Sequence, residues 1–119
     1  MGLLTITGRL LLVIGLCLAA AGGHAAGFRF MELPAAADGP ALEGAMWYPC
    51  TEPPGELQLG LFTVPAAKDC PLAGEKLPLV VISHGRGGWF GGHHDTAETL
   101  ADSGFVVAAI SHAGDTGSI

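Results

Sequence analysis

The sequence predicts an α/β fold: an antiparallel hairpin followed by a βαβ unit of a mostly parallel sheet, with the sheet left incomplete. Two continuously apolar, β-branched runs, Leu79–Ser83 and Phe105–Ser111, carry the βαβ prediction, because such runs are typical of strands covered on both faces. A glycine-rich turn and an amphipathic stretch lie between them. Burying both strands would need further elements, so we expect the amino-terminal part of a larger domain.

The residues before this unit predict the hairpin. Phe28–Leu33 and Ala41–Tyr48 have strand-like patterns, and Asp38-Gly39 between them is a common hairpin turn sequence. The proline-rich, acidic connection that follows, residues 49–76, is long for a compact domain and holds at most a short strand at Leu57–Phe62.

The amphipathic stretch predicts a helix that starts at Asp95. Asp95 with Glu98 three residues later resembles a capping box. Gly104 lies where a glycine commonly ends a helix. Three apolar residues fall on one helical face: Ala97, Leu100 and Ala101.

Residues 1–25 predict a secretory signal peptide. Arg9 supplies a positive charge, a roughly 14-residue apolar run follows, and small residues suit cleavage after Ala25. A membrane-spanning helix needs about 20 apolar residues, and a lipoprotein signal would need Gly or Ala where Leu16 precedes Cys17. We therefore expect an exported chain, residues 26–119, in the periplasm or the medium, without a stable membrane anchor after signal removal.

Charge and cysteine content restrict the partners. Residues 26–119 contain four basic and eleven acidic residues. Without a basic patch, nucleic acid is a poor partner. In an exported chain, Cys50 and Cys70 favour a disulfide around a loop of about 20 residues. Two free thiols, or a metal pair that lacks its other ligands, are the alternatives.

The turn after Leu79–Ser83, "SHGRGG", allows three interpretations. A phosphate-binding loop would need a following Gly-Lys-Ser/Thr, or a third glycine spaced to open a helix directly, and neither is present. An oxyanion hole would use a backbone N–H of the turn, with small residues that let a substrate approach. A plain tight turn over a packed His84 is the third interpretation.

The segments "GAMWYP", "LPLVVISHGRGG" and "AETLADSGFVVAAISHAGDT" together resemble a family. They are similar to secreted bacterial dienelactone-hydrolase-like proteins of the α/β-hydrolase superfamily, close to the platelet-activating-factor acetylhydrolase type. The resemblance covers about residues 28–116. Ala113 stands where that family often has proline.

The resemblance implies roles for the turn. Arg86 would supply the backbone N–H of an oxyanion hole, and Gly85 and Gly87 would leave room around it. His84 would orient the turn, and Gly88 would belong to the supporting turn. It also implies a serine-dependent hydrolase of carboxylic esters that acts on a small-molecule ester or lipid-like substrate without a cofactor.

The catalytic triad of such an enzyme is absent from this sequence. No serine lies in a Gly-x-Ser-x-Gly elbow, and in this superfamily the order is Ser, then Asp or Glu, then His. We expect all three beyond Ile119, and the 119-residue chain by itself to be inactive. The alternative is a non-catalytic exported binding domain or a truncated, inactive product.

Two groups of side chains near the turn leave alternatives open. His84, His93, His94 and His112 with Asp95 or Asp115 do not have the spacing of a metal site, so we predict no metal. Trp89 and Phe90 suit a wall of the substrate pocket or a hydrophobic plug.

Overall fold

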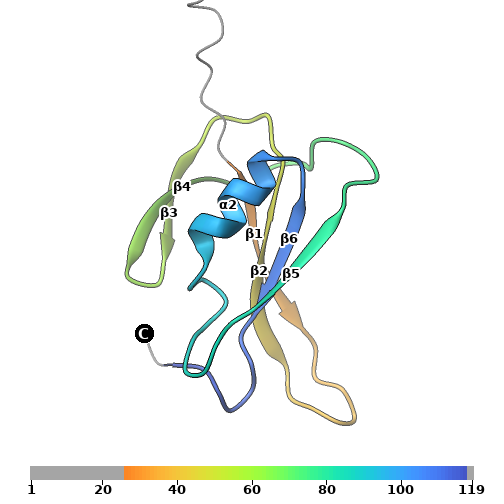
Figure 1. The fold of residues 1–119 in the computed structure, drawn as a ribbon, viewed down its shortest axis with the longest axis vertical. Helices are drawn as coiled ribbons and strands as arrows, with labels where there is room; N and C mark the ends of the chain where they lie inside the picture. Colours follow the sequence, from red (N-terminus) through yellow and green to blue (C-terminus); the bar gives the residue numbers. More distant parts are fainter. Residues whose placement is uncertain (1–25, 118–119) are drawn as a thin grey trace, which may run out of the picture.

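The computed structural model describes residues 26–117, so the predicted signal peptide lies outside the described residues. In that part of the chain, six strands form one sheet with a helix packed against it (Figure 1). The strand order is β3-β4-β1-β2-β6-β5. The elements are β1 (Gly27–Leu33), β2 (Leu42–Tyr48), β3 (Gly55–Leu59), β4 (Phe62–Lys68), β5 (Leu79–Ser83), α2 (His94–Asp102) and β6 (Val106–Ile110).

The predicted hairpin is confirmed: β1 and β2 pair antiparallel from Gly27 opposite Tyr48 to Leu33 opposite Leu42. Its turn differs from the prediction. Ala36 and Gly39 exchange two backbone hydrogen bonds, which makes Ala37 and Asp38 the central residues. The φ of Gly39 is not in the left-handed region, so the turn does not need the conformational freedom of glycine there.

The long connection holds more structure than predicted. A second hairpin, β3–β4, occupies much of it. The short strand predicted at residues 57–62 is confirmed for Leu57–Leu59 and then interrupted, because Gly60 and Leu61 form the turn. Gly60 has a φ of 60°, which suits this reversal. Burial alternates on both sides of the turn, with Leu57 and Leu59 buried in β3 and Val64 in β4.

The βαβ unit is confirmed, but the sheet around it is mixed. β5 and β6 pair in parallel, with α2 between them in the chain. β6 pairs with β2 antiparallel, and of the five strand pairs in the described residues only β5–β6 and β1–β4 are parallel. The described part of the sheet is therefore mixed, and a mostly parallel sheet in a larger domain stays a prediction.

Helix α2 begins one residue earlier than predicted. His93 is its N-cap residue and makes no side-chain capping bond, so the predicted capping box is wrong. Asp95 instead accepts a hydrogen bond from the Thr96 amide, 2.8 Å away. The predicted C-terminal glycine is confirmed: Gly104 has a φ of 98°, and its amide donates to Ala101 as in a Schellman motif.

The core lies between α2 and one face of the sheet. Phe28, Trp47 and Val107 are fully buried there, and the Phe28 and Trp47 rings meet edge to face with centroids 5.2 Å apart. Ala97 and Ala101 let the helix approach closely. No helix in residues 26–117 is long and apolar enough to cross a membrane.

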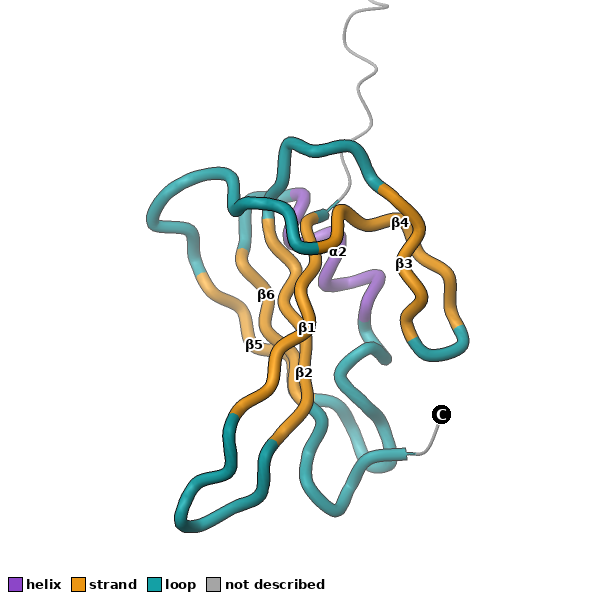
Figure 2. Tube along the Cα trace, turned by 180° about the vertical axis from the view of Figure 1, so that it is seen from behind, coloured by secondary structure: helices purple, strands orange, loops and turns teal. Residues whose placement is uncertain are grey.

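The opposite face of the sheet is not covered at β5. Leu79 is 61% exposed and Val81 is 63% exposed. β5 is an edge strand of the described sheet, and α2 lies on the other side (Figures 1 and 2). Within the described residues β5 is therefore covered on one face, and its burial on both faces stays a prediction for a larger domain.

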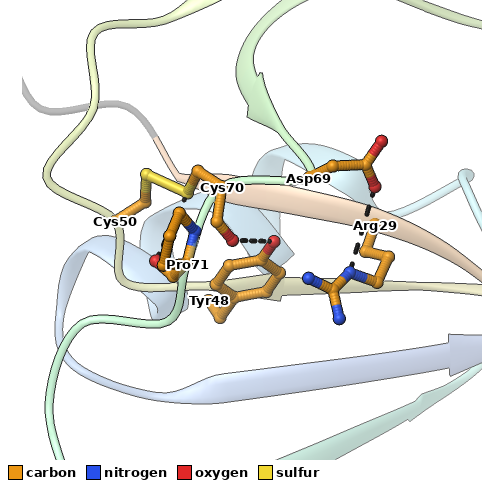
Figure 3. Close-up of polar contacts among 6 residues, drawn as sticks. All are labelled: Arg29, Tyr48, Cys50, Asp69, Cys70 and Pro71. Carbon is orange, nitrogen blue, oxygen red and sulfur yellow. Dashed lines mark hydrogen bonds and ion pairs between the residues drawn. A yellow bond between two sulfur atoms is a disulfide. The ribbon is translucent and has the colours of Figure 1, made fainter.

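A disulfide links the chain just after β2 to the chain just after β4. Cys50 and Cys70 form the bond that their spacing and the predicted export favour, with Cα atoms 6.5 Å apart. The buried Tyr48 hydroxyl donates to the Cys70 carbonyl oxygen, 2.7 Å away, as Figure 3 shows. Burial raises the pKa of Tyr48, and the nearby Arg29 guanidinium offsets part of that rise.

Candidate functional site

Two loops leave the sheet together at the carboxyl ends of β5 and β6. We call them the β5 turn, residues 84–92, and the β6 loop, residues 111–117. The parallel pairing of β5 and β6 brings them to the same edge, and they lie side by side in both views (Figures 1 and 2). Ligands of α/β proteins bind at such an edge.

His84 connects the two loops. Its side chain is buried, with 7% of the residue exposed. Its Nε2 accepts a hydrogen bond from the His112 amide at 2.9 Å, and its Nδ1 lies 2.7 Å from the Gly85 carbonyl oxygen. Both bonds form only when the ring is neutral with its proton on Nδ1, because Nε2 must accept. Both ring nitrogens are thus engaged with backbone, as expected of a positioning residue.

Ser83 and His112 form a second connection. The Ser83 Oγ lies 2.8 Å from the His112 Nε2, a distance typical of a nucleophile and its base. Ser83, however, ends a strand and does not lie on an elbow between a strand and a helix. In the described residues, no carboxylate forms a hydrogen bond with His112 to orient it as a base. We therefore interpret this pair as part of the loop junction.

The amide of Arg86 differs from the two amides that follow it in the turn. None of the hydrogen bonds within residues 26–117 uses it as a donor, whereas the Gly87 amide donates to Asp115 Oδ1 at 3.1 Å and the Gly88 amide to Gly85 at 3.0 Å. Arg86 is exposed. A Cβ added to Gly85 or Gly87 would meet no atom within 4 Å, so the space around this part of the turn is open.

The end of the β6 loop lies against the same turn. The Gly117 amide donates to the Gly88 carbonyl oxygen at 3.0 Å. A Cβ at Gly117 would overlap the carbonyl oxygen of Gly87, so only glycine fits this close approach of two backbones. The two loops therefore support each other through backbone contacts as well as through side chains.

The two aromatic residues of the turn differ in their surroundings. Both pack against the main core, and their ring centroids are 5.1 Å apart. The Trp89 ring lies directly over Gly91, where an added Cβ would collide with it. Phe90 lines a cavity with Phe30, and its amide donates to Ser111 Oγ at 3.1 Å.

The predicted absence of a metal rests on the sequence, and the structure adds the positions of the candidate ligands. His94 Nδ1 lies 3.4 Å from Glu98 Oε1. Burial raises the pKa of Glu98, and the hydrogen bond from His94 offsets part of the rise. In the described residues, the group with three potential ligand atoms close together is Cys50, Glu52 and Cys70, and the disulfide already joins both sulfurs.

Sequence reasoning missed three residues that hold the turn: Ser111, His112 and Asp115. Each makes a hydrogen bond to the β5 turn or to Ser83. A usable signal was present, because all three directly follow a second apolar strand, and the carboxyl ends of adjacent parallel strands share one edge.

A family model described as "Platelet-activating factor acetylhydrolase, isoform II" matches residues 50–119, more than half of the chain. The chain belongs to this family. The platelet-activating factor acetylhydrolase of Cavia porcellus is 41% identical over 58 residues, which are 48% of this chain and 13% of that protein. The acetylhydrolase of Canis lupus familiaris is 46% identical over 54 residues, 44% of this chain and 12% of that protein.

A solved structure has a similar fold to this member of the acetylhydrolase family. The ferulic acid esterase from Streptomyces cinnamoneus has a TM-score of 0.62 and 24% identity, over 81% of this chain and 36% of the esterase chain. The similarity supports the predicted α/β-hydrolase fold. The chain thus spans about a third of the length of that esterase and about an eighth of the length of the two acetylhydrolases.

Proposed function

We propose that this chain forms the oxyanion-hole part of the active site of a serine-dependent ester hydrolase. The substrate would be a small-molecule ester or a lipid-like ester, and no cofactor would be needed. The observation that carries the proposal is the Arg86 amide, which has no hydrogen-bond partner in the described residues and lies between Gly85 and Gly87, where an added Cβ would meet no atom within 4 Å. Such a donor suits the negatively charged oxygen of a tetrahedral intermediate.

The turn has the rigidity that this role requires. His84, Asp115 and Ser111 each bond to a different part of the two loops, so the direction of the Arg86 amide is set before a substrate binds. A donor fixed in advance stabilises developing charge without reorganising during the reaction. In this proposal His84 acts as a positioning residue, and Gly85 and Gly87 leave room for the substrate, whereas Gly88 packs against His84 and the Gly85 carbonyl oxygen.

The remaining catalytic groups would lie beyond Ile119, in the order Ser, Asp or Glu, and His. Membership of a family whose relatives are much longer supports this expectation. Export is part of the same proposal, with residues 1–25 as the signal peptide. The bond between Cys50 and Cys70 supports export, because disulfides persist in oxidising compartments.

The test compares Arg86→Pro with Arg86→Ala in the protein translated from the complete gene. Proline removes the backbone N–H, whereas alanine removes the side chain and keeps that donor. We expect Arg86→Pro to lower kcat for p-nitrophenyl acetate about 100- to 1,000-fold and Arg86→Ala to keep near-normal activity. Circular dichroism and thermal melting verify that both variants are folded. Near-normal activity of a folded Arg86→Pro variant would contradict the assignment.

A Ser83→Ala variant tests whether Ser83, at the strand end, or the proposed elbow serine is the nucleophile. Ser83→Ala should retain hydrolysis, because Ser83 serves the loop junction in this proposal. Complete loss of activity in a folded Ser83→Ala protein would identify Ser83 and His112 as the reacting pair instead. The 119-residue chain should show no esterase turnover, and an active 119-residue chain would contradict the proposed location of the triad. Inertness of the complete protein toward all esters would favour the exported binding domain.

A further inference from the structure

A cavity of about 410 Å³ lies beside the β5 turn. It is formed where the outer part of the β1–β2 hairpin faces Phe90. The lining residues are Phe30, Met31, Glu32, Glu43, Gly44 and Phe90. Their side chains are not needed for the oxyanion hole, so the cavity calls for an explanation of its own.

Hydrogen bonds place this cavity at the same edge of the sheet as the β5 turn. The Ser111 amide donates to the Glu43 carbonyl oxygen at 2.8 Å, and Ser111 Oγ accepts from the Phe90 amide at 3.1 Å. Gly44 pairs with Ile110, the last residue of β6. An ester bound with its carbonyl oxygen at the Arg86 amide would therefore have this cavity within its surroundings.

Two aromatic rings form an apolar wall of the cavity. The Phe30 and Phe90 rings meet nearly edge to face, with centroids 6.3 Å apart. Phe30 is 45% exposed although it also packs on Phe28, at a centroid distance of 4.8 Å. A large aromatic surface that stays half exposed beside a cavity is available to a ligand.

Two carboxylates restrict what that ligand can be. Glu32 and Glu43 lie directly opposite each other across β1 and β2. The ion pairs of the described residues are Arg29–Asp69 and His94–Glu98, so neither carboxylate is neutralised in one. Like charges placed opposite each other are unfavourable, and they repel an anionic group. A cation is tolerated nearby, since the Lys68 Nζ lies 5.7 Å from the Phe30 ring centroid.

We propose that this cavity is a specificity pocket that takes an apolar, preferably aromatic, group of the ester substrate and rejects groups with a negative charge. Phe30 and Phe90 contact the group, and Glu32 and Glu43 exclude anions. The inference rests on the proposed ester hydrolysis and adds the substrate class. Phe30 lies in the first strand of the hairpin, far in sequence from the β5 turn, and the fold alone brings it there.

The test measures kcat/KM of the complete protein for p-nitrophenyl acetate and p-nitrophenyl 3-phenylpropionate. Acetate carries no aromatic group to place in the cavity. Removing one aromatic pairing between pocket and substrate corresponds to about a 5- to 10-fold change. We expect Phe30→Ala to lower kcat/KM for phenylpropionate by that factor, mainly through KM, and to leave acetate within about 2-fold. Phe62→Ala is the matched control, because Phe62 is similarly exposed, at 50%, but lies on β4 and does not line the cavity.

A second pair of substrates tests the carboxylates independently of the ring. Wild type should prefer the phenylpropionate ester to its 4-carboxyphenyl analogue, and Glu32→Gln with Glu43→Gln should reduce that preference about 10-fold, as expected when two nearby charges are removed. If Phe30→Ala does not fold, the double glutamine variant still tests the pocket. Phe30→Leu tests it as well, because it keeps an apolar side chain and should show a smaller KM effect.

The outcomes separate the two proposals. If acetate is hydrolysed normally, but the Phe30 and glutamate variants treat all three esters as wild type does, the specificity pocket is wrong and the proposed function stands. Equal losses for acetate and phenylpropionate in Phe30→Ala would also overturn the pocket, because they would indicate a general disturbance. If wild type hydrolyses no ester, the proposed function itself is wrong.

Discussion

Replacing His84 by alanine should loosen both loops of the candidate site at once. The ring supplies the acceptor for the His112 amide and contacts the Gly85 carbonyl oxygen, and it lies against the His112 ring with centroids 4.1 Å apart. No other side chain in the described residues makes hydrogen bonds to the backbone of both loops. The expected effect is therefore on stability and on the geometry of the turn together.

The magnitude follows from these interactions. The His112 amide is part-buried, and leaving it without its partner costs about 1–2 kcal/mol. Truncation of a side chain that is only 7% exposed adds about 1–2 kcal/mol because the site packs less well. We expect His84→Ala to lower the free energy of unfolding by about 2–4 kcal/mol in total. His84→Phe keeps most of the ring volume and removes both hydrogen bonds, so it should show mainly the first contribution.

Urea denaturation and steady-state kinetics of the complete protein test this reasoning. Both variants should unfold at lower urea, and kcat/KM should fall while its pH profile keeps its shape, because His84 transfers no proton in the proposed mechanism. A variant with unchanged stability and a loss of activity of about 1,000-fold or more would refute the positioning role and identify His84 as a participant in the chemistry.

Two further predictions concern the disulfide end of the sheet (Figure 3). Replacing Cys50 and Cys70 together by serine should lower the free energy of unfolding by about 3 kcal/mol, because the bond closes a loop across a sequence separation of 20. Thermal melts with and without reductant check this prediction. An equal response of wild type and variant to reductant would contradict it. Tyr48→Phe removes the bond to the Cys70 carbonyl oxygen and should cost about 1 kcal/mol near neutral pH. Because burial raises the folded-state pKa of Tyr48 above its ordinary value near 10, the wild type should lose stability as the pH rises through and above 10. Tyr48→Phe should lose less over that range, and parallel pH dependences of the two proteins would show that Tyr48 is not responsible.

Local patterns predict several elements well because their causes are local. The apolar runs at β5 and β6 identify two strands, because a short continuous run of β-branched residues favours extended backbone. Gly104 ends α2 as expected, since a left-handed residue is needed there and glycine adopts that conformation at little cost. The predicted start of α2 is wrong by one residue because the preceding turn, and not a side-chain cap, sets where the helix begins.

Elements that depend on distant partners could not be predicted in the same way. The β3–β4 hairpin is hard to recognise in the sequence because Pro65 and a glycine at position 60 obscure two short strands. Whether β5 is covered on both faces depends on neighbours that its own residues do not encode. The antiparallel pairing of β6 with β2 likewise follows from the arrangement of the whole sheet, because each strand pattern allows either direction.

The same division applies to the candidate site. The sequence by itself determined the family resemblance, the glycine turn after β5 and the choice of Arg86, because these depend on residue types at short spacing. Only the tertiary structure decided which groups brace that turn and where the neighbouring cavity lies. Ser111, His112 and Asp115 reach the turn from residues 111–117, and Phe30 reaches Phe90 from β1. Such contacts follow from how the strands are ordered and paired, and residue types at short spacing do not specify that order.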